Sequence, residues 1–240
     1  MQALMDLHTH TVASVHAYST LTENAREAKK NGLEILGVSD HGYGMPHTTL
    51  PEYWHNIKVI PPYLEGVRIL KGIEMNLYDM EGTLYEEELL DKVDYVIASL
   101  HLNTFKDDPN AISDYTDVYV HALERYPQIT IIGHPDDGHI PLDYERFVKA
   151  CKEHHVAVEM NCSSLMPGAY RKNARENQKA YLELCREYDV PVIIDSDAHM
   201  SVHVGVFDRA YEVLSELDYP TENVVNFSWG RLEELLGRAL

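Results

Sequence analysis

The sequence is poor in cationic side chains. Among its 240 residues, 20 Lys and Arg stand against 39 Asp and Glu, which gives a formal net charge of −19. Such a chain has no diffuse positive surface to replace the counterions of a polynucleotide or to attract an anionic bilayer. We therefore expect neither nucleic acid nor a membrane among its partners.

Cysteine and long apolar runs are also scarce. The three cysteines, Cys151, Cys162 and Cys185, are odd in number, and no two have Cys-x-x-Cys spacing, so we expect buried free thiols in a reducing compartment. No apolar stretch approaches the roughly 20 residues of a membrane span. The first residues lack the basic and apolar regions of a signal peptide. These absences predict a cytoplasmic protein.

The composition is that of an ordinary globular chain, with 45% hydrophobic and 25% charged residues. No linker-like or low-complexity segment divides it, so we expect one domain over residues 1–240. Seven short apolar runs, many of them β-branched, are typical of strands that are covered on both faces, as in a parallel sheet. These runs are residues 3–7, 33–38, 67–73, 95–100, 129–132, 156–160 and 192–194.

Helix signals stand in most intervals between these runs. Thr20 and Glu23 have capping-box spacing, Asp143 can cap a helix that runs to about residue 154, and residues 171–188 have apolar side chains at helical spacing. Residues 42–62 carry four prolines and are expected as a long irregular loop, a candidate lid. Alternating strands and helices indicate βαβ units, which can close as a barrel or open as a doubly wound sheet.

Histidine is abundant, with 14 residues, and its placement distinguishes the two architectures. Six of the seven runs end on, or are followed by, side chains that can bind metal. These are His8, His10, His16, His41, Glu74, His101, His134, Asp197 and His199. The carboxyl ends of strands in a parallel barrel converge on one face, whereas an open sheet spreads them along a line. We therefore predict a barrel with these nine side chains in one site.

The number and spacing of these side chains indicate more than one ion. His8 and His10 are two residues apart, as are Asp197 and His199, so in extended backbone each pair points to one side. A tetrahedral zinc ion takes three or four ligands, so nine candidates predict two or three ions. The Glu74 carboxylate is able to bridge two of them. The other seven histidines lack this placement, and most are expected in packing or surface roles; His47 and His203, in loops on the side of the site, stay as weaker candidates.

The ordered motifs Asp-Leu-His-Thr-His, Ser-Asp-His-Gly, Gly-His-Pro-Asp and Asp-Ser-Asp-Ala-His resemble those of the PHP (polymerase and histidinol phosphatase) superfamily. They begin at residues 6, 39, 133 and 195. Within the superfamily, residues 11–21, 71–74 and 161–164 are similar to the YcdX-type phosphatases. The resemblance covers essentially the whole chain. It implies a distorted, TIM-like (β/α)7 barrel of PHP type with a trinuclear site, usually of zinc, that hydrolyses phosphoesters.

The resemblance also implies a division of the ligands among three ions. One ion takes His8, His10, Glu74 and Asp197. A second shares Glu74 and adds His101 and His134, and the third takes His16, His41 and His199. Manganese or iron in place of zinc stays open. Three divalent ions against two carboxylates leave a local charge of about +4, which attracts a phosphate dianion.

The expected nucleophile is a metal-activated water, because the sequence holds no P-loop and no Gly-x-Ser-x-Gly elbow. Which residue protonates the leaving group stays open. Arg171 is a candidate phosphate contact, with a solvated position at a helix start as the alternative. Asp40 and Asp195 flank ligands and either orient imidazoles or cap the following turns.

The function that we expect is hydrolysis of a small phosphomonoester. The alternatives are a histidinol-phosphate phosphatase, a phosphodiesterase or exonuclease on the same scaffold, and a non-catalytic metal-binding domain. The sequence names neither the physiological substrate nor the native metal. It leaves a monomer and a homo-oligomer equally open.

Overall fold

The computed structural model describes residues 2–240. Seven parallel strands form a curved sheet in the order β1-β2-β4-β5-β6-β7-β8, and β3 pairs antiparallel with β4. The strands are β1 (Met5–Asp6), β2 (Ile35–Val38), β3 (Tyr63–Leu64), β4 (Val67–Leu77), β5 (Tyr95–Leu100), β6 (Ile129–Ile132), β7 (Ala157–Asn161) and β8 (Val192–Asp195). All seven predicted runs overlap a strand, and only the short β3 was not expected; β4 continues to Leu77, so Glu74 lies within it rather than at its end.

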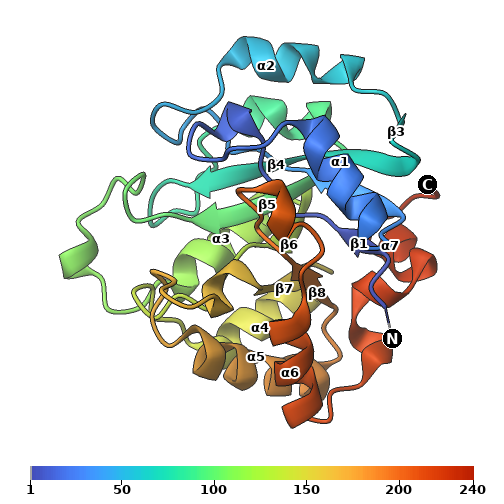
Figure 1. The fold of residues 1–240 in the computed structure, drawn as a ribbon. Coiled ribbons are helices and arrows are strands. Elements are labelled where there is room, and N and C mark those ends of the chain that lie inside the picture. Colours follow the sequence, from blue (N-terminus) through green and yellow to red (C-terminus); the bar gives the residue numbers. More distant parts are fainter. Residues whose placement is uncertain (1) are drawn as a thin grey trace.

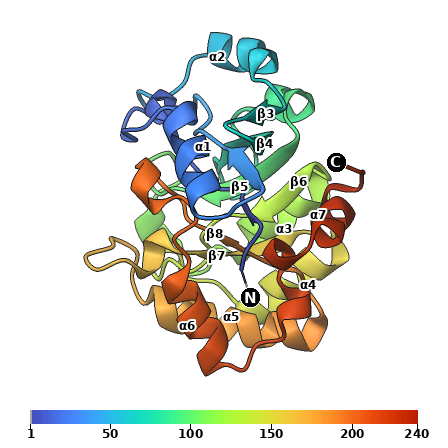
Figure 2. The ribbon, with the colours of Figure 1, turned by 45° about the vertical axis from the view of Figure 1, so that its right-hand side comes forward.

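Helices lie around the outside of the sheet (Figures 1 and 2). They are α1 (Leu21–Lys30), α2 (Pro51–Asn56), α3 (Thr116–Arg125), α4 (Tyr144–Glu153), α5 (Ala174–Tyr188), α6 (Asp208–Glu216) and α7 (Trp229–Leu236). The capping box of Thr20 and Glu23 starts α1, and the Asp143 carboxylate accepts the backbone N–H groups of Glu145 and Arg146 at the start of α4. Strands followed by outer helices confirm the predicted α/β barrel.

The barrel closes through a side chain rather than a regular strand ladder, and the resemblance implies a distorted barrel without locating the distortion. An isolated parallel bridge joins Thr9 to Ala198 beyond the ends of β1 and β8. Between the strands themselves, the Asn226 amide donates to the carbonyls of Met5 (2.9 Å) and Ile194 (2.6 Å). Its oxygen accepts the Ile194 N–H at 2.7 Å. Asn226 is buried between the two strands, where backbone groups need hydrogen-bond partners. Its side chain supplies the bonds that a neighbouring strand would otherwise provide.

Two apolar cores hold the fold together. The larger one lies between the sheet and the surrounding helices. The smaller one fills the barrel interior, where Met5, Leu7 and Tyr95 pack with Leu232 of α7. α7 thus covers the end of the barrel where β1 begins (Figure 2).

Tyr95 fits inside the barrel only because two neighbouring strands carry glycine. A Cβ at Gly37 would stand 2.0 Å from the Tyr95 hydroxyl oxygen, and one at Gly72 would stand 2.2 Å from its ring. The buried hydroxyl donates to the carbonyl of Leu7, the residue immediately before His8. A large polar side chain therefore ties β5 to the segment that carries the first histidines.

Residues 42–62 depart from the irregular loop that we expected, because they contain α2. Pro51 at the first helical position and Glu52 in the first turn both favour a helix start. The buried Trp54 donates its indole N–H to Thr49 Oγ1 at 2.8 Å, and Thr49 in turn donates to the His41 carbonyl. The predicted helix at 171–188 also begins three residues later, at Ala174.

The three cysteines are free and buried, as the sequence predicts. In the part of the chain that the structure describes, no helix combines the length and the hydropathy that crossing a bilayer requires.

Candidate metal centre

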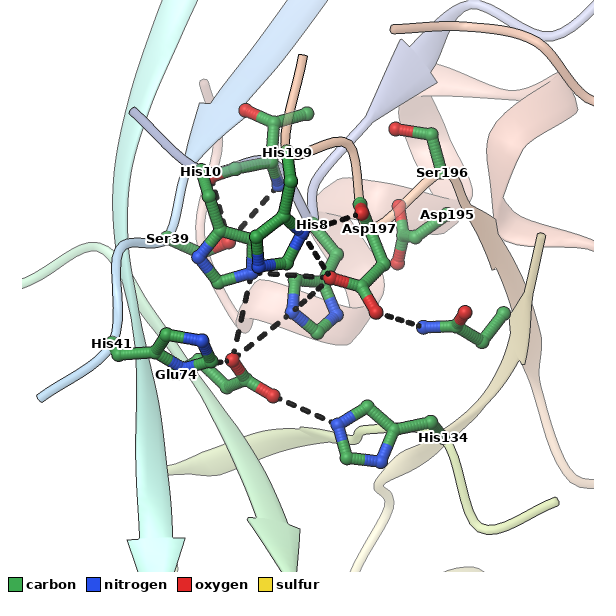
Figure 3. Close-up of polar contacts among 12 residues, drawn as sticks. His8, His10, Ser39, His41, Glu74, His134, Asp195, Ser196, Asp197 and His199 are labelled. Carbon is green, nitrogen blue, oxygen red and sulfur yellow. Dashed lines mark hydrogen bonds and ion pairs between the residues drawn. The ribbon is translucent and has the colours of Figure 1, made fainter. Parts of the chain in front are cut away.

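The nine predicted side chains lie together on one face of the barrel, and Figure 3 shows all of them except His16 and His101. The carboxylates of Glu74 and Asp197 face each other across the centre, and the rings of His8, His10, His41, His134 and His199 surround them. Each carboxylate comes from a different side of the barrel, Glu74 from within β4 and Asp197 from just after β8. The closed sheet therefore brings together residues that are 123 positions apart in the sequence.

Glu74 is the common partner of most of these imidazoles. Its two oxygens lie within 3.5 Å of a ring nitrogen from five histidines. The partners are His41 at 2.6 Å, His134 at 2.9 Å, His8 and His101 at 3.4 Å, and His10 at 3.5 Å. A carboxylate in this position is able to serve two ions, as the sequence predicts.

Asp197 provides the second point of convergence. Its Oδ1 lies 3.2 Å from His10 Nε2, 3.7 Å from His8 Nε2 and 3.4 Å from His199 Nδ1. Its backbone φ of 51° is in the left-handed region, where a non-glycine residue is strained. The adjacent turn therefore aims this carboxylate into the site at a conformational cost.

The remaining histidines form a stack on the side of His10. The His10 and His199 ring centroids are 4.2 Å apart, and those of His16 and His199 are 4.7 Å apart. His16 Nε2 lies 3.2 Å from His41 Nε2. His16 follows a short 3-10 turn, Val12–Ser14, which folds back so that the Tyr18 N–H donates to the His199 carbonyl at 2.8 Å.

The cluster contains buried polar atoms that lack hydrogen bonds, as expected of a site that binds metal ions. Eleven buried side-chain polar atoms of the described residues lack a hydrogen bond, and four of them lie in this cluster: His8 Nε2, His10 Nε2, His41 Nδ1 and Glu74 Oε2, the last two only 2.6 Å apart. Orphaned polar atoms in a protein interior are costly and rare. All four belong to one cluster and all are donors that zinc prefers. The residues therefore fit bound divalent cations.

The proposed division among three ions matches the geometry in part. His8, His10 and Asp197 present ligand atoms within 4.8 Å of one another, as the first predicted group requires. A second such group joins His41, rather than His134, to Glu74 and His101. His10, His41 and His199 form a third. His41 thus belongs to two of these groups, the one with Glu74 and the one with His199.

The ring orientation of four imidazoles is set by hydrogen bonds at Nδ1. The partners are Glu159 for His8 at 2.6 Å, Ser14 for His10 at 3.1 Å, Asn76 for His101 at 3.0 Å, and the Asp197 carbonyl for His199 at 3.0 Å. When an acceptor takes the Nδ1 proton, Nε2 keeps its lone pair, which is the form that binds a metal. These four rings are therefore held ready as Nε2 ligands.

The pKa values of the buried histidines are also consistent with a site for cations. Burial lowers the pKa of His10 well below its usual value and lowers that of His101 to about 4 despite the nearby Glu74, so both rings are neutral. His8 differs. Burial opposes its protonation, but Glu159, Glu74 and Asp197 together raise its pKa well above the usual value. A proton at His8 thus offsets an excess of negative charge that a cation would offset when bound.

Strand β7 contributes two supporting side chains that sequence reasoning missed. Glu159 Oε2 accepts the His134 N–H at 2.5 Å and the Asn161 amide at 3.1 Å, while Oε1 is with His8. The same amide also donates to Asp197 Oδ2 at 3.1 Å. Both residues are buried and two positions apart, so they face the barrel interior together. Their position at a strand end, shared with most of the nine predicted ligands, is the signal that could have identified them.

The sequence leaves two roles open for Asp40, and the structure favours a turn anchor. Its oxygens accept the Thr11 N–H and hydroxyl at 2.7 Å, the Ser14 hydroxyl at 2.6 Å and the Tyr53 hydroxyl at 2.7 Å. Because the Ser14 proton is used in this way, Ser14 Oγ accepts from His10 Nδ1. Asp40 therefore reaches an imidazole only through Ser14.

Asp195 likewise acts on the backbone. Its Oδ1 accepts the Leu7 N–H at 2.6 Å, immediately before His8. The carboxylate thus fixes the strand segment that carries the first ligand rather than the ring of a ligand.

Arg171 lies at the edge of the cluster, with its side chain only 15% exposed. Its Nη1 donates to Asn161 Oδ1, Ser164 Oγ and Asp197 Oδ2, each at 3.2 Å. This burial contradicts the solvated alternative. The guanidinium holds the outer oxygen of Asp197, and its place beside the cluster is where a phosphate contact was expected.

Comparisons with known proteins were made on sequence and on fold. The family model described as PHP domain matches residues 6–217. A probable phosphatase of Acetivibrio thermocellus is 39% identical over 99% of this chain and 97% of its own length. A probable phosphatase of Thermoanaerobacter sp. is 40% identical over 98% of this chain and 95% of its own.

The solved structures share the fold at low sequence identity. A histidinol phosphate phosphatase from Lactococcus lactis, complexed with zinc, L-histidinol and phosphate, aligns with a TM-score of 0.66. It is 15% identical and covers 92% of this chain and 95% of its own. A chain in an archaeal ribonuclease P structure aligns with a TM-score of 0.57 at 16% identity, over 96% of this chain and 87% of its own.

Proposed function

The chain belongs to the PHP domain family, and from this premise we propose that it hydrolyses phosphomonoesters of small molecules at a centre of three divalent metal ions. The coarser statement, that it is a metal-dependent phosphatase, follows from the family and from the probable phosphatases that match it end to end. The number of ions, their identity and the substrate class are the proposal.

The observation that carries the proposal is that four buried nitrogen and oxygen atoms of the histidine and carboxylate cluster lack a hydrogen bond. The nine residues proposed as ligands are His8, His10, His16, His41, Glu74, His101, His134, Asp197 and His199. Nitrogen and carboxylate donors suit zinc, with manganese or iron as alternatives. Zinc also accompanies phosphate in the histidinol phosphate phosphatase that shares the fold.

Bound divalent ions would lower the pKa of a water molecule and neutralise charge on the phosphoryl oxygens. The chain's own residues supply the order around that chemistry. Glu159, Ser14 and Asn76 fix the rings of His8, His10 and His101. The closed barrel keeps most of these side chains away from bulk water. Some N–H groups of Arg171 donate to Asp197. We propose that its other N–H groups donate to a phosphate oxygen of the substrate.

A small monoester suits the charge distribution better than a polynucleotide. The chain carries a net charge of −19, so its surface offers little to replace the counterions of a nucleic acid backbone. The positive charge of the site is confined to the metal cluster and Arg171. A monoester dianion is attracted there more strongly than a diester monoanion. The partner that we propose is therefore a small phosphorylated molecule.

The proposal is tested by comparing p-nitrophenyl phosphate with bis-p-nitrophenyl phosphate on metal-loaded protein. We expect the monoester to be hydrolysed with a much higher kcat/KM, and single- and double-stranded DNA to stay intact at physiological salt. A clear preference for the diester, or efficient digestion of DNA, would contradict the monoesterase assignment and favour the phosphodiesterase alternative.

A further inference from the structure

A cavity of about 420 Å³ opens beside the proposed metal centre. Its wall includes His101 and His134, two of the proposed ligands, and Arg171. Leu100 and Leu102 add apolar surface, and Tyr170 completes another part of the lining. A molecule whose phosphate lies on the metal centre thus has room for its organic part in this cavity.

Tyr170 is an unusual residue for a protein surface, because 70% of this large aromatic side chain is exposed. It is nevertheless held in place. The His139 ring stacks on it, with centroids 5.1 Å apart and an angle of only 7° between the planes. His139 itself is fixed by Asp137, which accepts its Nδ1–H at 2.8 Å and its backbone N–H at 3.0 Å.

The two segments that carry this stack are also tied to each other. Asp137 Oδ1 accepts the Lys172 N–H at 3.3 Å, and the Gly138 N–H donates to the Lys172 carbonyl at 2.8 Å. Asp137 is largely buried, although it also lines part of the cavity. The ring of Tyr170 therefore stands on a braced support rather than on a free loop.

His139 stacks on one face of the Tyr170 ring, and among the described residues no other aromatic ring stacks on Tyr170. Tyr170 lines the cavity together with His101 and Arg171, whereas His139 is not part of that lining. A flat, exposed aromatic face next to a phosphate site is suited to stack on a planar ring.

We propose that the Tyr170 ring is a stacking platform for the organic part of the substrate, and that the preferred substrates are phosphomonoesters of alcohols that carry a planar aromatic or heteroaromatic ring. This inference rests on the proposed phosphomonoesterase function and adds the class of leaving group to it. Leu100 and Leu102 also line the cavity and give it apolar surface that suits such a ring. The polar groups beside Arg171 remain for the phosphate.

The sharpest test compares two ligands that differ only in ring planarity. Benzylphosphonate and cyclohexylmethylphosphonate are non-hydrolysable, have the same carbon skeleton and carry the same charged group. Their Kd values for the metal-loaded protein can be measured by calorimetry. We expect benzylphosphonate to bind more tightly, and Tyr170→Ala to reduce the ratio of the two Kd values about two- to tenfold, as for loss of one aromatic pair.

Three further variants separate stacking from general disruption. Tyr170→Phe keeps the ring and should keep the ratio. His139→Ala removes the ring behind Tyr170 and should lower the ratio in part. Tyr63→Ala removes an exposed tyrosine on β3, outside this cavity, and should leave the ratio unchanged.

Equal affinity of the wild-type protein for the two phosphonates would overturn the inference, and so would a ratio that survives Tyr170→Ala. Hydrolysis of benzyl phosphate and cyclohexylmethyl phosphate is then compared as a separate readout. If neither ester is hydrolysed and p-nitrophenyl phosphate is not either, the proposed function fails. The phosphonate affinities still decide whether Tyr170 recognises a planar ring.

Discussion

Glu159 Oε1 lies 2.6 Å from Nδ1 of His8, while Nε2 of the same imidazole faces Glu74 and Asp197. A carboxylate on the far nitrogen of a ligand histidine fixes its tautomer and strengthens it as a donor to metal. Both Glu159 oxygens are already engaged, so this residue supports the ligands without being one. One buried carboxylate therefore serves the ring of His8 and the backbone of His134 at once.

This relationship predicts that Glu159→Gln weakens metal binding while the ligands stay in place. We expect the affinity for zinc to fall about 10- to 100-fold, because a neutral amide is a poorer partner for the Nδ1–H group. Competition with a chromophoric chelator measures the affinity directly. Glu153→Gln, an exposed change on α4, serves as the matched control. An affinity equal to that of the wild type would contradict the positioning role.

Glu74 is the carboxylate on which most of the imidazoles converge, so its charge should be essential. Glu74→Gln keeps the shape but removes the charge that balances two cations. We expect the loss of at least one metal ion per chain and of most phosphatase activity. The circular dichroism spectrum should be retained, because the two apolar cores do not depend on this residue. Full metal content with wild-type turnover would show that Glu74 does not bridge.

Arg171 is expected to act mainly on substrate binding. Each charge-assisted hydrogen bond contributes about 1.5–3 kcal/mol, so Arg171→Ala should raise KM roughly ten- to a hundredfold. The contact with Asp197 adds a smaller decrease in kcat. Steady-state kinetics separate the two effects, with Arg175→Ala on α5 as the control for loss of a nearby guanidinium. A change in kcat alone would contradict the phosphate contact.

Glu86 predicts a pH dependence of stability outside the proposed ligand set. Burial raises the pKa of Glu86 to about 7, although its oxygens accept the Gly44 N–H at 2.7 Å and the Asn76 amide at 3.2 Å. Because the folded state keeps a proton that the unfolded chain releases near 4.5, this carboxyl stabilises the fold fully below about pH 4.5. That contribution is lost as the pH rises to about 7.

Glu86→Gln should therefore gain stability relative to the wild type as the pH rises from 5 to 8, by at most about 3 kcal/mol. Chemical unfolding at several pH values gives the difference in free energy. The exposed neighbouring change Glu88→Gln should show no such trend. A difference between Glu86→Gln and wild type that does not vary with pH would contradict the buried, protonated carboxyl.

The strands and the proposed ligands could be predicted because both follow from local pattern. A short run such as 129–132 is mostly apolar, since the sheet is covered on both faces, and His134 follows it after one glycine. Once the strands are parallel and closed, the ends must meet on one face. Predicting that the nine side chains lie together therefore requires only the arrangement of the strands, not their detailed packing.

The supporting contacts could not be predicted in the same way, because they depend on which strands are neighbours and on the register between them. Nothing local to Glu159 indicates that its partner is His8, 151 residues away. Asn226 closes the barrel from a 3-10 turn that has no strand pattern of its own. The stack of Tyr170 on His139 likewise joins two loops whose proximity the sequence does not encode locally.

The most direct test of the account is a metal titration of chelator-treated protein, with bound zinc and hydrolysis of p-nitrophenyl phosphate measured on the same samples. We predict that metal-free protein is inactive and that activity returns as ions bind, reaching a plateau at about three equivalents per chain. Full activity without metal, or a plateau at one equivalent with no further binding, would contradict the trinuclear phosphatase centre.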